Sequence, residues 1–62
     1  MKINDKVRMN RTYLKIEAYL KNGAISLLEA VFEIDKLWKE GRMNIDEAEA
    51  AIRILARVKK GA

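Results

Sequence analysis

One helix-starting device occurs twice in this sequence, eighteen residues apart. Residues 23–30 align with residues 41–48, which pairs glycine with glycine, Ser26 with Asn44, and Glu-Ala with Glu-Ala. A cap residue followed three positions later by Glu is typical of a capping box, in which both side chains satisfy free backbone N–H groups. The glycine before each cap can end the preceding helix in the left-handed conformation. The repeat therefore predicts three helices joined by two short turns.

Apolar residues recur at helical spacing in three segments, which predicts helices over about residues 5–21, 27–40 and 45–59. No stretch of alternating β-branched residues indicates a strand. Short connections favour antiparallel neighbours. We therefore expect an all-α protein, a single domain in which three short antiparallel helices form a bundle that is completed by self-association.

The same spacing assigns one face of each helix to the core. The expected core residues of the three helices, in chain order, are Met9, Tyr13, Ile16, Leu20, Leu27, Ala30, Val31, Ile34, Leu37, Trp38, Ala48, Ala51, Ile52, Leu55 and Val58. Leu28 and Phe32 are four residues apart on a side of the second helix that is otherwise polar.

Apolar residues left outside these faces indicate a second contact surface. A chain of 62 residues has a small core, and without Cys or His it cannot use disulfides or the usual zinc sites. We therefore expect a homodimer or larger assembly. The alternative is that helix packing turns some of these residues into the monomer core. The expected interface residues are Val7, Leu14, Leu28, Phe32 and Ile54.

Charge is arranged in three blocks, with net charges of +4, −4 and +4 in residues 1–24, 25–50 and 51–62. Two basic stripes at helical spacing are candidates for contact with nucleic-acid phosphates. The alternative is that both stripes, one on the first helix and one on the third, are solvated faces that bind nothing. On the third helix, basic residues in the last turn also complement the negative end of the helix dipole. The third helix opens with carboxylates, so we do not expect it to enter the major groove. The candidate contacts are Arg8, Arg11, Lys15, Arg53, Arg57 and Lys60.

The sequence contains few residues suited to catalysis. Ser26 is explained as a helix cap, and no base is placed beside it. The carboxylate pairs of residues 29 and 33 and of residues 46 and 49 are weak metal candidates without histidine. We expect no enzymatic activity, no catalytic residues, no cofactor, no metal and no small-molecule substrate. No apolar run is long enough to span a bilayer, so we expect a cytoplasmic protein with no membrane partner.

The segment of residues 37–55 combines the end of one helix, Glu40-Gly41, an apolar residue, the Asn44 cap and Asp46-Glu47-Ala48. This pattern resembles the short helical hairpins called SHOCT-like domains, and also the first half of small antitoxin and phage-regulator hairpins. It covers about a third of the chain and consists mostly of cap chemistry. The antitoxin-type pattern continues into a recognition helix for which this sequence has no segment, so we assign no family from the resemblance.

Three functions remain open. The first is a small non-enzymatic interaction or regulatory protein, of a size common in phage and plasmid genomes, that self-associates and binds a partner macromolecule. The second is a DNA-binding regulator that contacts phosphates through the basic stripe of the first helix. The third is an antitoxin-like or inhibitory partner of a larger protein. We favour the first.

Overall fold

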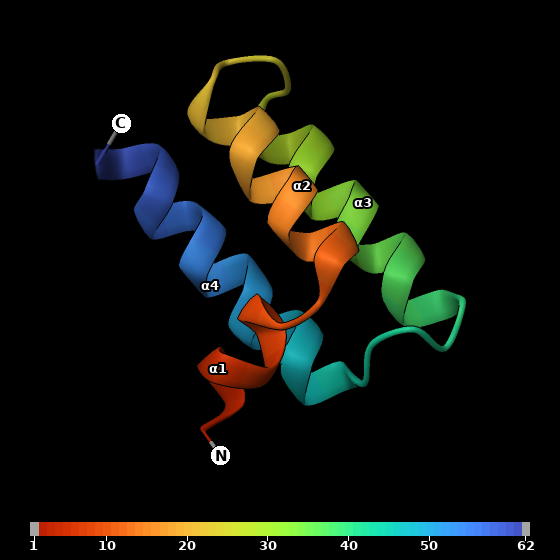
Figure 1. Cartoon of the computed structure of the whole chain (residues 1–62). Helices are drawn as coiled ribbons and strands as arrows, with labels where there is room; N and C mark the ends of the chain where they lie inside the picture. Colours follow the sequence, from red (N-terminus) through yellow and green to blue (C-terminus); the bar gives the residue numbers. More distant parts are fainter. Residues whose placement is uncertain (1, 62) are drawn as a thin grey trace.

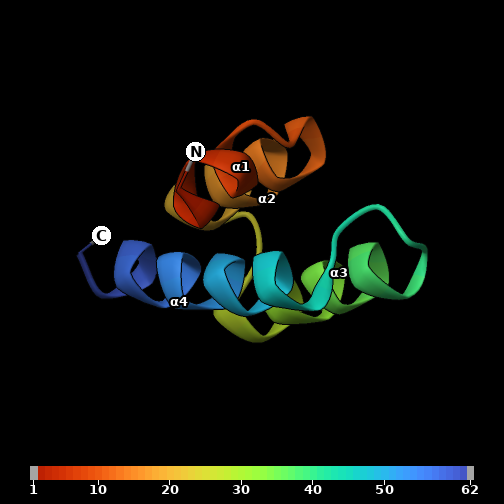
Figure 2. The same ribbon diagram turned by 90° about the horizontal axis from the view of Figure 1, so that it is seen from below.

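The computed structural model describes residues 2–61, which form four helices and no strand. They are α1 (Ile3–Arg8), α2 (Arg11–Lys21), α3 (Leu27–Lys39) and α4 (Ile45–Gly61). The antiparallel helices α3 and α4 form one layer, and α1 and α2 lie on one side of it (Figures 1 and 2). Helix α4 packs against each of the other three. The all-α prediction is confirmed, but the predicted count of three helices is wrong.

The first predicted helix is interrupted because Asn10 caps a new one. Its backbone is extended, with φ −79° and ψ 115°. Its Oδ1 accepts a hydrogen bond from the backbone N–H of Tyr13 at 3.1 Å. Asn is among the best N-cap residues, since its side chain offers the backbone an alternative to continuing the helix. One helix over residues 5–21 is therefore replaced by α1 and α2.

The break changes which side chains of the first segment face inward. In an uninterrupted helix Met9 would share a face with Tyr13, but Met9 lies between α1 and α2 and is 67% exposed. Val7 is fully buried instead. The predictions of Met9 as a core residue and of Val7 as an interface residue are therefore both wrong.

The two repeated turns behave largely as expected. Ser26 and Glu29 form the complete capping box, with Oγ of Ser26 accepting from the backbone N–H of Glu29 at 3.1 Å and the reciprocal bond at 3.2 Å. At the second turn, Oδ1 of Asn44 accepts from the backbone N–H of Glu47 at 2.8 Å. Gly23 and Gly41 both have φ +75°, a conformation that a side chain disfavours. Helices α3 and α4 end within two residues of their predicted limits.

The core is small and rich in alanine. Its buried hydrophobic residues are Val7, Tyr13, Ile16, Leu20, Ala30, Ile34, Leu37, Met43, Ala48, Ala50, Ala51, Ile54 and Leu55. Four of these thirteen are alanines, which let helices approach closely but remove little apolar area from water. Ile54 is only 4% exposed, so its prediction as an interface residue is wrong. Trp38 was expected in the core and is 40% exposed.

A polar contact ties the start of α2 to the turn between α3 and α4. The Arg42 guanidinium donates to Oγ1 of Thr12 at 2.8 Å and lies 3.9 Å from a carboxylate oxygen of Glu40. The Asn10 side chain donates to the Arg42 carbonyl at 3.4 Å.

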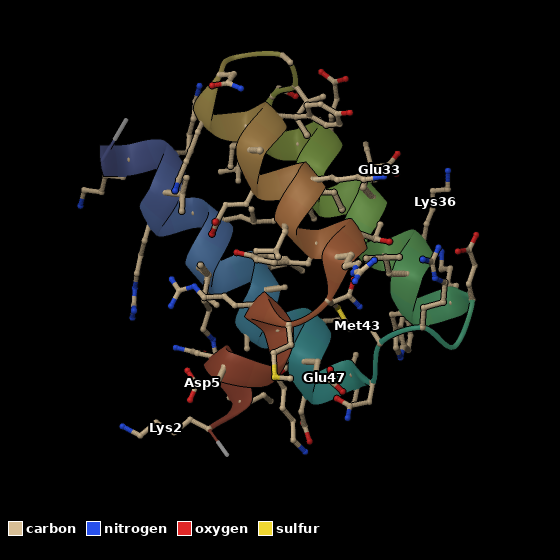
Figure 3. The ribbon with its side chains drawn as sticks, viewed as in Figure 1. Lys2, Asp5, Glu33, Lys36, Met43 and Glu47 are labelled. Atoms are coloured by element: carbon tan, nitrogen blue, oxygen red, sulfur yellow. The ribbon has the colours of Figure 1, made fainter. Side chains whose placement is uncertain are left out.

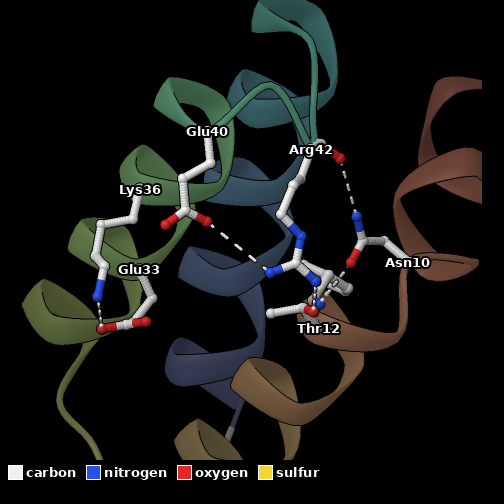
Figure 4. Close-up of polar contacts among 7 residues, drawn as sticks. Asn10, Thr12, Glu33, Lys36, Glu40 and Arg42 are labelled. Carbon is white, nitrogen blue, oxygen red and sulfur yellow. Dashed lines mark hydrogen bonds and ion pairs between the residues drawn. The ribbon is translucent and has the colours of Figure 1, made fainter.

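A separate ion pair lies on the edge of α3 away from α4 (Figure 3), where Lys36 pairs with Glu33 at 3.9 Å. Figure 4 shows both sets of contacts.

Candidate interaction surfaces

The outward side of α3 carries an exposed apolar pair, Leu28 and Phe32, which we call the α3 patch. Leu28 is 64% exposed and Phe32 is 59% exposed. Successive helix residues are about 100° apart around the axis, so this pair lies opposite the buried Ala30 and Ile34. The Nζ of Lys39 pairs with the Asp35 carboxylate at 2.8 Å on the same side of the helix. The α3 patch is therefore apolar, and one ion pair lies beyond it on the same side of α3.

The predicted interface residues do not form one surface. Val7 and Ile54 are buried within the chain, as described above. Leu14 is 43% exposed but belongs to α2, in the other layer of the molecule. Only Leu28 and Phe32 are brought together on a single exposed side.

Two further exposed apolar residues lie where α3 and α4 meet their shared turn. Trp38 is in the last turn of α3, and Ile45, which is 47% exposed, begins α4. Ile45 was not predicted as a surface residue. The feature of the sequence that could have predicted its exposure is its position directly after the Asn44 cap, outside the apolar spacing of α4.

A row of exposed residues runs along the outward side of α2, formed by Arg11, Lys15 and Tyr19, which we call the α2 row. The three residues are four positions apart, so they lie along one side of the helix. Tyr19 is 51% exposed. Neither Arg11 nor Lys15 forms an ion pair with another residue in the range 2–61. Two of the three predicted first-helix contacts therefore share a surface.

Arg8 does not belong to the α2 row, because the break at Asn10 separates it from α2. Its charge acts instead on Tyr13, whose hydroxyl donates to Oε1 of Glu17 at 2.8 Å. Burial raises the pKa of Tyr13 well above its usual value, and the hydrogen bond and negative charge of Glu17 raise it further, while Arg8 opposes the shift. Lys21 pairs with the same Glu17 carboxylate at 3.8 Å. This cluster is part of the packing of α1 and α2.

The basic stripe of α4 faces away from the α2 row. Arg53, Arg57 and Lys60 are exposed, on the side of α4 opposite the buried Ala51 and Leu55. Helices α2 and α4 pack on each other through their buried sides, so their outward sides point in different directions. Arg53 also pairs with Glu49 at 3.8 Å. The structure therefore does not join the two predicted basic stripes into one surface.

Arg42 is a basic residue near the α2 row that the sequence analysis missed. Its bond to Thr12 places its guanidinium on α2, although the two residues are thirty positions apart. No local sequence pattern connects such distant residues. Only the packing of the α3–α4 turn against the start of α2 brings them together.

Residues 2–61 contain no group of three or more potential metal ligands and no pocket, and none of their helices is long and apolar enough to cross a membrane. Comparison with protein-family models, curated proteins and solved structures finds no match to this chain. The α3 patch and the α2 row are therefore the candidate interaction surfaces of the described residues.

Proposed function

We propose that this chain is a small, non-enzymatic helical interaction protein that self-associates through the α3 patch and binds a partner macromolecule. The observation that supports this most directly is the exposure of Leu28 and Phe32, at 64% and 59%, on one side of α3. Covering apolar surface gains about 25 cal/mol per Å² removed from water. A second copy offers the same apolar surface in return.

The small core makes such a contact useful to the protein. In a chain under about 70 residues one core rarely supplies more than about 3–5 kcal/mol of stability. Alanines form four of the thirteen buried hydrophobic positions, and the chain has no cysteine for a disulfide. Binding that involves only the folded state stabilises that state by mass action. Self-association through the α3 patch therefore supplements the core.

The charges around the α3 patch suit a symmetric contact. In a two-fold dimer the same surface meets itself. If two α3 helices pair antiparallel with Phe32 at the centre, Lys36 of one copy is level with Leu28 and next to Glu29 of the other. Each end of the contact then holds the Lys36 cation of one copy and the Glu29 carboxylate of the other. The partner for the α3 patch is accordingly a second copy of this chain.

Light scattering after size-exclusion chromatography, over a dilution series, tests this proposal. The wild-type chain should show a mass above that of a monomer at the highest concentrations. The double variant Leu28→Lys/Phe32→Lys should be monomeric throughout, because two desolvated lysines per copy would face each other across the contact. Its helicity by circular dichroism should match that of the wild type, since both side chains are exposed.

A matched control adds the same two charges to the other layer. The double variant Met9→Lys/Leu14→Lys replaces two exposed apolar residues, 67% and 43% exposed, and should keep the wild-type mass. A wild-type chain that is monomeric at every concentration contradicts the proposal. So does an equal loss of association in both double variants.

A further inference from the structure

The α2 row consists of exposed residues on the side of α2 that faces away from the core. The inward side of α2 is formed by the buried Tyr13, Ile16 and Leu20. Arg11 and Lys15 have no ion-pair partner within residues 2–61. We infer that the α2 row binds single-stranded nucleic acid, with the two cations contacting phosphates and Tyr19 stacking on a base.

The spacing of the α2 row suits a nucleic-acid strand. Residues four apart in a helix are separated by about 6 Å along its axis. This is close to the distance between successive phosphates of one strand, so two cations four positions apart can contact neighbouring phosphates. Tyr19 is one further turn along and half exposed, within reach of a base attached to the same strand. Combining a basic groove or row with an aromatic platform is typical of proteins that bind single strands.

Arg42 extends the basic surface beside the α2 row. The hydrogen bond of its guanidinium to Thr12, at 2.8 Å, holds this third cation against the first turn of α2 (Figure 4). Thr12 immediately follows Arg11 and is three positions before Lys15, so the cation lies beside both. Glu40, at 3.9 Å, offsets part of this charge from the opposite side of the guanidinium.

A lipid surface fits the α2 row less well. A helix that lies in a membrane interface presents a continuous apolar side to the lipid. The apolar side of α2 is already buried in the core, and its exposed aliphatic residues are only Leu14, which is 43% exposed, and the small Ala18. The cations of the α2 row therefore adjoin only a short stretch of apolar surface, less than a helix lying in a membrane interface presents.

Duplex DNA fits less well than a single strand. Reading a duplex requires an element that enters a groove with donors or cations at its tip. The first turn of α4 carries Asp46 and Glu47, and the first turn of α2 lies against the α3–α4 turn, where Arg42 contacts Thr12. Stacking by Tyr19 requires a base whose face is not covered by its neighbours, which a single strand provides.

Fluorescence anisotropy with a short labelled oligothymidine tests the inference. The wild-type chain should bind at low salt, with affinity falling by about 0.7 log units per contacted phosphate for each tenfold rise in salt. Removing two contacts in Arg11→Gln/Lys15→Gln should reduce that slope by about 1.4. Tyr19→Ala should weaken binding about 5-fold to 150-fold without changing the slope, while Tyr19→Phe keeps the aromatic ring and the affinity.

A charge-matched control uses the other basic stripe. Arg53→Gln/Arg57→Gln removes the same charge from the outward side of α4 and should leave the salt slope near the wild-type value. Circular dichroism of every variant checks that it is folded. The inference is overturned by an absence of binding at low salt, by equal losses in the two charge variants, or by equal affinity for a duplex of the same sequence. Binding to phosphatidylserine vesicles that matches oligothymidine binding, and that Tyr19→Ala leaves unchanged, also overturns it.

Discussion

The two layers of this molecule are built from the same helical elements but differ in how their helix boundaries are encoded. Between α2 and α3, and between α3 and α4, a glycine at φ +75° is followed within three residues by a side-chain cap. Between α1 and α2 there is only the cap, Asn10, with no glycine before it. A boundary marked by both a stop and a start signal is evident from the sequence, whereas a cap alone is easily taken for an ordinary helical residue.

The outward sides of the two layers also differ. On α3, the charged neighbours of the α3 patch are paired within the helix, as in Asp35 with Lys39 and Glu33 with Lys36. On α2, Arg11 and Lys15 have no ion-pair partner among the described residues. Apolar exposure with paired charge favours a protein partner, and unpaired cations beside an aromatic ring favour a polyanion. The two proposed contacts therefore lie on different layers and do not compete for the same surface.

The largest expected effect tests the helix that both layers share. Leu55 on α4 is fully buried, and α4 packs against all three other helices. Leu55→Ala should lower the free energy of unfolding by about 2–5 kcal/mol, because the cavity affects the packing of both layers. Urea denaturation followed by circular dichroism measures the change.

The matched control is Leu28→Ala, which removes an equal side chain from the exposed α3 patch. Measured at a concentration where the wild-type chain is monomeric, it should change the free energy of unfolding by no more than about 0.5 kcal/mol. Similar losses in the two variants would mean that Leu28 is part of the folded core.

A smaller effect should appear at alkaline pH in the α1–α2 layer. The pKa of Tyr13 is raised above its usual value of 10.0 by burial and then by Glu17, so the folded chain keeps this hydroxyl protonated where the unfolded chain ionises. The contribution of the Tyr13 hydroxyl to the free energy of unfolding is complete below pH 10 and is lost as the pH rises further. The free energy of unfolding should fall by up to about 1.4 kcal/mol per pH unit from this group.

Tyr13→Phe removes the hydroxyl and keeps the aromatic ring, so it isolates the contribution of this one group. Urea denaturation between pH 8 and about pH 11 should show a shallower alkaline decline for the variant than for the wild type. Identical slopes would show that the Tyr13 hydroxyl is not protected in the folded chain. Tyr19→Phe is the control, since it makes the same chemical change at a half-exposed tyrosine instead of a buried one.

The smallest expected effect concerns the break itself. Asn10→Ala should lower the free energy of unfolding by about 1 kcal/mol, through loss of the cap bond to the backbone N–H of Tyr13. Ser26→Ala should cause a similar loss at the start of α3. Thermal denaturation compares the two. If Asn10→Ala were neutral or stabilising while Ser26→Ala destabilises, a continuous first helix would be nearly as stable as the observed break.

Much of the α3–α4 layer could be predicted from the sequence. Its helix limits, its capping box and the exposure of Leu28 and Phe32 follow from local hydrogen bonding and from spacing within one helix. In the α1–α2 layer the apolar spacing correctly predicted the buried Tyr13, Ile16 and Leu20, but it was wrong before Asn10, because it continued one helix through that residue. That error placed Met9 inside, Val7 outside and Arg8 in the wrong row.

Trp38 and Ile54 show a second limit. Both lie near the edge of an apolar face, where spacing alone locates a residue only to within tens of degrees. The angle at which helices cross decides which edge residue is covered. In this structure Ile54 is covered by neighbouring helices and Trp38 remains 40% exposed.

The sequence by itself determined the helical class of this protein, two of its three turns and the exposed side of α3, because these depend on interactions between residues at most four positions apart. Tertiary structure alone decided that α1 covers α4, that the two basic stripes face different ways, and that Arg42 lies on Thr12. These features depend on residues about thirty or more positions apart. Such residues meet only when the helices pack, and no local pattern encodes the angle at which they do so.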